Sequence, residues 1–129
     1  MTDPASTALV ERTPQSMRLI EHDPDESPRS IQLYSVDPST ARAAARMLVE
    51  LGVQGTLVGH SERRLYFGET DETVRLRAEA ALAAGLGVIA CVGETEAERE
   101  AGETEAVLTR QVAVLPRHEA LAIAYEPVW

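Results

Sequence analysis

The sequence predicts an α/β fold with about four parallel strands. Short apolar segments alternate with longer amphipathic ones, and this order requires right-handed crossovers between parallel strands. Aromatic residues make up only 4% of the chain, so we expect an aliphatic core of helices packed on strands. The 129 residues are about half of the chain that a closed (β/α)₈ barrel needs. The strands therefore form either a small open sheet or a half barrel, and hydrophobic periodicity does not distinguish the two.

The N-terminal part predicts two helices and one strand. Thr13 and Asp37 each precede a proline, which is the pattern of a helix N-cap followed by proline at the first helical position. The second of these helices has an apolar face at helical spacing, formed by Ala41, Ala44, Ala45 and Leu48. The expected elements are a helix over about 14–22, a turn over 23–28, a strand over 31–34 and a helix that ends at Gly52.

The rest of the chain predicts three strands, over 56–58, 87–92 and 121–125. The second is apolar throughout, which is typical of a parallel strand covered on both faces. A polar loop is expected over 59–69, followed by a helix that ends at Gly85. The inner face of that helix consists of Val74, Ala78, Ala81 and Leu82, and a later helix has Leu108, Val112 and Leu115 on its inner face.

The triplet Gly-Glu-Thr occurs at 68–70, 93–95 and 102–104, each time before a helical segment. The unequal spacing argues against a structural repeat. We interpret each triplet as a helix start, in which glycine frees the backbone, threonine caps the helix and acids occupy the first turn. Thr95 with Glu98 also matches a capping box for a short helix.

Charge and cysteine content exclude several classes of partner. The net charge of -9 repels nucleic acid and anionic membranes, so neither is an expected partner. All 12 basic residues are arginine, and the chain contains no lysine and no asparagine. For the pair Arg63 and Arg64 a structural salt bridge is favoured over an anion site. The single Cys91 fits a buried packing thiol in a reducing compartment, and no signal peptide is recognised, so we expect a cytoplasmic protein.

Polar residues follow three of the predicted strands, where ligands bind in parallel α/β folds. His60 follows the strand over 56–58, Gly93-Glu94 follows the next, and Glu126 follows the last. A carboxylate and an imidazole at one mouth suit proton transfer next to a polarised oxygen. Spacing alone leaves open that His60 is a structural loop histidine and Glu126 an exposed carboxylate. His22 and His118 have no partners at metal spacing, so neither a metal nor a cofactor is expected.

Residues 56–129 resemble triosephosphate isomerases, through GHSERR (59–64) with YFGE (66–69), AGLGVIACVGE (84–94) and AYEPVW (124–129). The resemblance implies a partial TIM barrel with His60 as electrophile and Glu126 as base. These would interconvert glyceraldehyde 3-phosphate and dihydroxyacetone phosphate through an enediolate, a step of glycolysis and gluconeogenesis. Ser61 and Glu62 would support the site, and Pro127, Val128 and Trp129 would form the first hinge of the lid.

The chain also departs from that family. The family's first strand supplies an asparagine and a lysine to the substrate, and this sequence has neither. By the resemblance, the lid glycines and the phosphate-binding loops would lie beyond Trp129. We therefore expect little or no isomerase activity from this chain. The alternative is a non-catalytic barrel fragment that self-associates, as a homo-oligomer, through open strand edges.

Residues 6–50 resemble flavin-dependent tRNA-dihydrouridine synthases, a second barrel family, through 7–20, 28–34 and Asp37-Pro38. By this resemblance Gln32 matches a flavin-contacting glutamine, so a flavin-binding remnant is a further alternative. The two resemblances together predict one partial barrel domain that contains strands three to six. Its segments would be 1–53, similar to the synthase, and 54–129, similar to the isomerase, as in a chimera.

Overall fold

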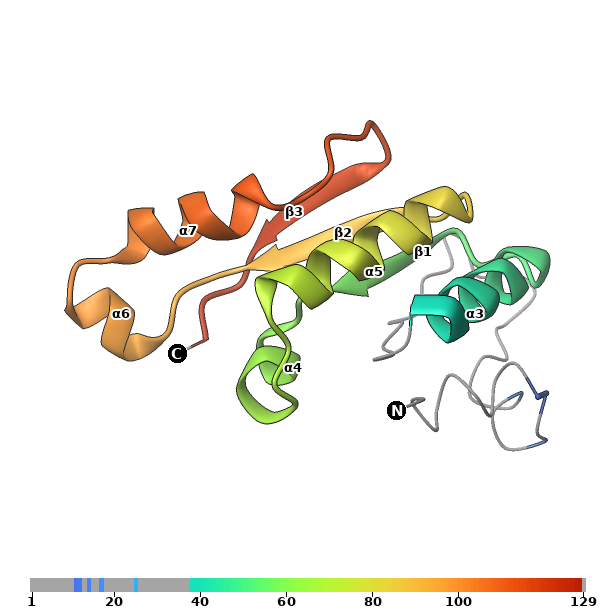
Figure 1. Ribbon diagram of the computed structural model, residues 1–129, viewed down its shortest axis with the longest axis horizontal. Helices are drawn as coiled ribbons and strands as arrows, with labels where there is room; N and C mark the ends of the chain where they lie inside the picture. Colours follow the sequence, from blue (N-terminus) through green and yellow to red (C-terminus); the bar gives the residue numbers. More distant parts are fainter. Residues whose placement is uncertain (1–10, 13, 15–16, 18–24, 26–37, 129) are drawn as a thin grey trace.

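The computed structural model describes residues 11, 12, 14, 17, 25 and 38–128 of the chain (Figure 1). The helix predicted over 14–22 and the turn over 23–28 fall almost entirely outside the described residues. The strand predicted over 31–34, with Gln32, lies wholly outside them, as do His22 and Trp129. The account below therefore concerns mainly 38–128.

Three parallel strands form the sheet, in the order β1-β2-β3. They are β1 (Gly55–Val58), β2 (Gly87–Val92) and β3 (Leu121–Tyr125). Leu57 of β1 pairs with Ile89 of β2, which pairs with Ala122 of β3, so these three residues form one row across the sheet. The strands predicted after residue 55 are confirmed, and their carboxyl ends lie at one edge of the sheet.

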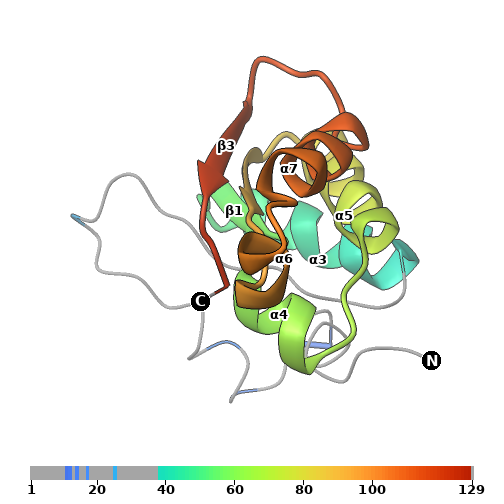
Figure 2. The ribbon, with the colours of Figure 1, turned by 90° about the vertical axis from the view of Figure 1, so that its left-hand side faces the viewer.

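Five helices are described: α3 (Pro38–Glu50), α4 (Ser61–Tyr66), α5 (Asp71–Ala83), α6 (Glu96–Glu100) and α7 (Thr104–Ala113). Figure 2 shows that α3, α5 and α7 lie on one side of the sheet. Helices α4 and α5 follow β1, and α6 and α7 follow β2, and each pair returns the chain to the start of the next parallel strand, as an α/β fold requires. None of the helices in the described part of the chain has the length and apolar content needed to cross a membrane.

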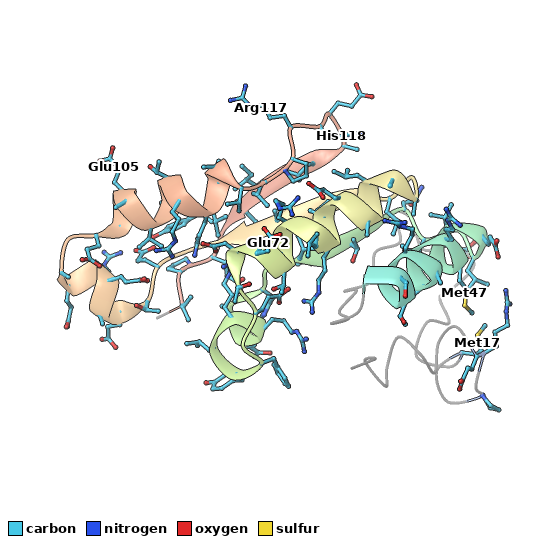
Figure 3. The ribbon with its side chains drawn as sticks, viewed as in Figure 1. Met17, Met47, Glu72, Glu105, Arg117 and His118 are labelled. Carbon is cyan, nitrogen blue, oxygen red and sulfur yellow. The ribbon has the colours of Figure 1, made fainter. Side chains whose placement is uncertain are left out.

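The core lies between the sheet and these helices. Val58, Val88 and Ala90 of the sheet are no more than 2% exposed. The inner faces predicted for α3 and α5 are confirmed, because Ala44, Ala45 and Leu48 of α3 and Val74, Ala78 and Ala81 of α5 are buried, with Leu82 partly buried against them; the side chain of Ala41 is outside the described part. Met47 of α3 also belongs to the core, and Met17 packs against it from outside the helical layer (Figure 3).

The opposite face of β2 is covered only in part. Cys91 on that face is buried, but 41% of Ile89, two residues before it, is exposed. The prediction that 87–92 is covered on both faces therefore holds at Cys91 and is wrong at Ile89. An all-apolar strand does not reveal which of its faces will find a partner, because that depends on how far the sheet closes.

The polar loop predicted over 59–69 contains the helix α4, so that prediction is wrong as well. No residue of α4 is buried, and its apolar residues are exposed: Leu65 by 49% and Tyr66 by 75%. A helix without an apolar face has no periodicity to detect. Its start is instead capped by His60, whose side chain accepts a hydrogen bond from the Glu62 N–H.

Two expectations about helices near the C-terminus also need correction. Of the predicted inner face of α7, Leu115 just after the helix is buried in the core and Leu108 packs against it, but Val112 is 38% exposed. The buried residues of the helix itself are Val107 and Gln111. The Gly-Glu-Thr triplets start helices in all three places. Thr70 and Thr95 cap α5 and α6 with capping boxes, but Thr104 lies inside α7, which has no side-chain cap.

A buried ion pair anchors the segment between α4 and α5. Arg77 donates a hydrogen bond from Nη1 to Oε1 of Glu69, and the two side chains are 6% and 1% exposed. Arg63 Nε lies 3.7 Å from the other oxygen of Glu69. Removing one partner of a buried pair leaves an uncompensated charge in the interior, so this segment depends on both partners.

We expect Glu69→Ala to lower the free energy of unfolding by about 3–5 kcal/mol, measured by urea denaturation at neutral pH, because Arg77 would stay buried without its carboxylate. Glu72→Ala is the matched control, since Glu72 also pairs with an arginine, Arg75, but its side chain is 62% exposed. That variant should unfold close to wild type. Equal losses in the two variants would contradict the anchoring role of Glu69.

Candidate active site

The sheet brings together two of the residues singled out in the sequence. His60 follows β1, Glu126 follows β3, and the imidazole Nε2 lies 3.0 Å from Glu126 Oε1. About a third of each side chain is exposed, 30% for His60 and 33% for Glu126. The two residues are far apart in sequence, and they meet because the carboxyl ends of parallel strands share one edge.

Ser61 holds the Glu126 carboxylate at two points. Its backbone N–H donates to Oε2 at 3.2 Å, and its hydroxyl lies 3.1 Å from Oε1. With His60, Ser61 thus accounts for hydrogen bonds to both oxygens. Glu126 is therefore not a free carboxylate at the end of a strand, and a substrate that uses it as a base must replace the Ser61 contacts.

The hydrogen bonds of His60 define its tautomer. Nδ1 accepts the backbone N–H of Glu62 at 3.3 Å, so it carries no proton. The proton of the neutral ring then lies on Nε2, which faces Glu126. A neutral imidazole with an Nε2–H can donate a hydrogen bond to a carbonyl or enediolate oxygen.

Two glycines allow the backbones to approach at the site. A Cβ on Gly93 would lie 2.1 Å from the Glu126 carbonyl oxygen, so β2 and β3 could not meet there with a side chain in between. Gly59 has a φ of +71°, and a Cβ on it would lie 2.9 Å from the Cys91 carbonyl oxygen. Both positions therefore require glycine, and they hold the segments that carry His60 and Glu126 close to the end of β2.

Glu94, next to Gly93, has a fully buried side chain that sequence reasoning did not interpret. The Tyr125 hydroxyl lies 2.9 and 3.0 Å from its two oxygens, and the Thr104 hydroxyl lies 3.3 Å from Oε1. The hydrogen bond to Glu94, with a smaller contribution from burial, raises the pKa of Tyr125. In the sequence, Glu94 could be recognised only as a polar residue after a strand, because its partners Tyr125 and Thr104 come from β3 and α7.

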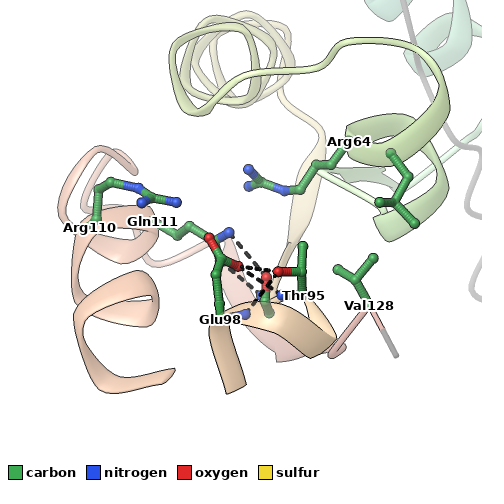
Figure 4. A pocket seen from close by; sticks show the side chains of 8 residues that line it. Arg64, Thr95, Glu98, Arg110, Gln111 and Val128 are labelled. Atoms are coloured by element: carbon green, nitrogen blue, oxygen red, sulfur yellow. Dashed lines mark hydrogen bonds between the residues drawn. The ribbon is translucent and has the colours of Figure 1, made fainter. Parts of the chain in front are cut away.

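The remaining residues proposed for the site lie nearby. The Val128 N–H donates to the Glu94 carbonyl oxygen at 2.9 Å, which fastens the segment after Glu126 to the end of β2. Val128 also lines a cavity of about 160 Å³ together with Arg64, Thr95 and Gln111 (Figure 4). Pro127 is partly buried, and the Glu62 side chain is exposed while its backbone N–H donates to the capping side chain of His60. Their expected roles as hinge and support stay predictions.

Arg64 and Cys91 have structural surroundings. Arg64 Nη1 lies 2.7 Å from Asp71 Oδ1, as expected for a structural salt bridge. Cys91 is buried, and its burial, together with the nearby Glu126 carboxylate, raises the pKa of the thiol from 9.0 to about 11. Within the described residues no group of three histidine, cysteine or acidic side chains could hold a metal ion.

Comparison with known proteins identifies similar chains. The family model described as triosephosphate isomerase matches residues 32–129. The triosephosphate isomerase of Delftia acidovorans is 56% identical over 95 residues, which cover 70% of this chain and 38% of that protein. That of Paracidovorax citrulli is 57% identical over 106 residues, 78% of this chain and 42% of that protein. The chain therefore spans well under half the length of these curated relatives.

A solved structure supports the fold. The crystal structure of triosephosphate isomerase from Bartonella henselae is similar with a TM-score of 0.63 and 47% identity, over 66% of this chain and 38% of that one. The expected partial TIM barrel is thereby confirmed, with three parallel strands described. The expected chimera is not supported, because the triosephosphate isomerase family model begins at residue 32 and so includes 32–50 of the segment compared with dihydrouridine synthases. The flavin alternative loses its main support with it.

We expect the Cys91 thiol to resist alkylation by iodoacetamide in the folded chain at pH 8. Its pKa is about 11, so the reactive thiolate is rare until the pH approaches that value. Because the folded pKa is raised, the protonated thiol stabilises the fold below pH 9 and loses this effect as the pH rises toward 11. The rate is followed by mass spectrometry, with the chain in concentrated urea as the control. Equal rates in the folded and unfolded chains would contradict the assignment.

Proposed function

Because the chain belongs to the triosephosphate isomerase family, we propose that His60 and Glu126 carry out the acid–base chemistry of triose phosphate isomerisation. Glu126 would remove a proton from the carbon beside the substrate carbonyl. The Nε2–H of His60 would donate a hydrogen bond to the oxygen as negative charge develops on it. Return of the proton to the neighbouring carbon, together with transfer of the hydroxyl proton from one oxygen to the other, converts glyceraldehyde 3-phosphate and dihydroxyacetone phosphate into each other through an enediolate.

The observation that carries this proposal is the 3.0 Å contact between His60 Nε2 and Glu126 Oε1. A base and a hydrogen-bond donor this close can serve a carbon and an oxygen that are bonded to each other. The Nδ1 hydrogen bond to Glu62 supports the same roles, since it keeps the proton on the nitrogen that faces the site. Ser61 would hold the carboxylate until substrate takes its place.

We further propose that this chain alone turns over substrate weakly or not at all. The enediolate and the phosphate are anionic, and the chain contains no lysine and no asparagine to stabilise them. Arg64, which lies beside the site, is already paired with Asp71. The acid–base pair is therefore present without the electrostatic groups that would hold a phosphorylated triose between its members.

A coupled isomerase assay tests both statements. We expect turnover at least about 10²-fold below that of a full-length relative such as the Delftia acidovorans enzyme, because one missing electrostatic group costs about that factor. Any residual turnover should disappear in Glu126→Gln and persist in Glu119→Gln, an exposed acid before β3. Turnover that equals the relative's, or that survives Glu126→Gln, would overturn the proposal.

We also propose that the chain self-associates, which keeps open the non-catalytic alternative. Several large apolar side chains are exposed, among them Ile89 by 41%, Ile123 by 48% and Phe67 by 63%. Within the described residues, the edge of β3 opposite β2 pairs with no other strand, and an unpaired edge of this kind readily adds another chain.

A single domain over 1–129, located in the cytoplasm and acting in glycolysis or gluconeogenesis, fits the family and the reduced Cys91.

Size-exclusion chromatography with light scattering measures the association. We expect a mass above that of the 14.0 kDa chain at micromolar concentration, falling toward the monomer on dilution. Ile89→Ser should shift the equilibrium toward the monomer, because it removes exposed apolar surface without opening the core. A sharp monomer peak for the wild-type chain would contradict self-association.

A further inference from the structure

The carbonyl group that precedes His60 is held by a side chain. Arg64 Nε donates to the Gly59 carbonyl oxygen at 3.1 Å and thereby fixes the peptide plane that joins Gly59 to His60. This peptide has little room, since Gly59 already lies against Cys91 and Val74. The direction in which the imidazole leaves the backbone therefore depends on where Arg64 is held.

Asp71 holds Arg64. Its Oδ1 accepts Nη1 of Arg64 at 2.7 Å, and its Oδ2 accepts Nε of Arg110 at 3.0 Å. The three residues come from the first turn of α5, from α4 and from α7, so one carboxylate joins three helices. Figure 4 shows Arg64 and Arg110 extending toward each other from their two helices. Side-chain exposure rises outward, from 13% for Arg64 through 21% for Asp71 to 58% for Arg110.

The contacts among Arg64, Asp71 and Arg110 join oppositely charged groups. Burial raises the pKa of Asp71, but the hydrogen bonds from Arg64 and Arg110 outweigh it and the pKa is lowered, so Asp71 stays ionised at neutral pH. Hydrogen bonds between charged groups are stronger than those between neutral ones, and Arg110 fixes the oxygen that Arg64 does not use. Because both oxygens of the Asp71 carboxylate accept hydrogen bonds, its orientation toward Arg64 is fixed.

We propose that Asp71 is a positioning residue for His60, acting through Arg64 and the Gly59 carbonyl group, with Arg110 as the support that fixes Asp71. The relevance of this inference to catalysis rests on the proposed function, because only there does His60 act on substrate. The positioning itself is a property of the free chain. It can therefore be measured in the full chain without substrate.

The test is nitrogen-15 NMR of the histidine rings in the full chain, with His60→Gln used only to assign signals. In the wild type we expect one tautomer, with Nδ1 unprotonated and Nε2 protonated, as the hydrogen bond from Glu62 requires. In Asp71→Asn the two ring nitrogens of His60 should move toward an averaged shift. The exchange of the Glu62 amide proton should accelerate about tenfold, which is the loss of one charge-assisted hydrogen bond in its support.

Controls separate positioning from general loosening. Glu72→Gln lies next to Asp71 on α5 (Figure 3) and weakens an exposed pair with Arg75, so it should leave the His60 nitrogens unchanged. His118, which is exposed before β3, serves as the internal reference in every spectrum. The Ala90 amide, at the centre of β2, reports whether exchange has increased throughout the fold.

Arg110→Gln keeps the inference testable if Asp71→Asn does not fold. Arg110 is the most exposed member, so its replacement should leave the core intact and shift the His60 nitrogens in the same direction by a smaller amount. Unchanged His60 nitrogens in a folded Asp71→Asn chain, or in Arg110→Gln where the first variant does not fold, would overturn the proposal. A shift of His60 in a chain without isomerase turnover would uphold the positioning and count only against the proposed function.

Discussion

Parallel pairing of β1, β2 and β3 is the constraint on which the rest of the described structure depends. Because the strands run the same way, each connection must cross back over the sheet as a helix, and every carboxyl end lies at one edge. The helices that bury Val88 and Ala90 on one face also leave the polar segments after each strand together on that edge. The core and the candidate site are thus two results of one arrangement.

At that edge of the sheet, the segments after the strands approach one another through backbone contacts at two glycines. Gly93 lets the chain after β3 lie against the end of β2, and Gly59 lets the loop after β1 lie against Cys91. Polar side chains then hold the segments in place, because the buried Glu94 accepts a hydrogen bond from Tyr125 and Arg64 donates one to the Gly59 carbonyl group. The backbone segments that carry His60 and Glu126 are therefore held in place, although each of the two side chains is about one third exposed.

Family membership favours a catalytic site in this chain, whereas its composition lacks two residue types expected to bind the substrate. The match over 32–129 places the chain in the triosephosphate isomerase family, and the structure brings His60 within 3.0 Å of Glu126, the contact on which the proposed proton transfer rests. The chain has no lysine and no asparagine, and Arg64 beside the pair is engaged by Asp71, which is why weak turnover is proposed. The open face of the sheet around Ile89 shows where the described part of the barrel remains unclosed.

The sequence by itself determined the strands after residue 55 and the inner faces of α3 and α5, because these follow from local periodicity. It also singled out His60 and Glu126, as residues placed after strands and through the motifs GHSERR and AYEPVW, since spacing alone left their roles open. Only the tertiary structure decided that α4 is a helix, that Glu94 is buried with Tyr125, and that Arg64, Asp71 and Arg110 form one network. Their partners lie on other elements, so no local pattern reports them. Whether a face such as that of Ile89 is covered likewise depends on how the sheet closes, and periodicity carries no information about closure.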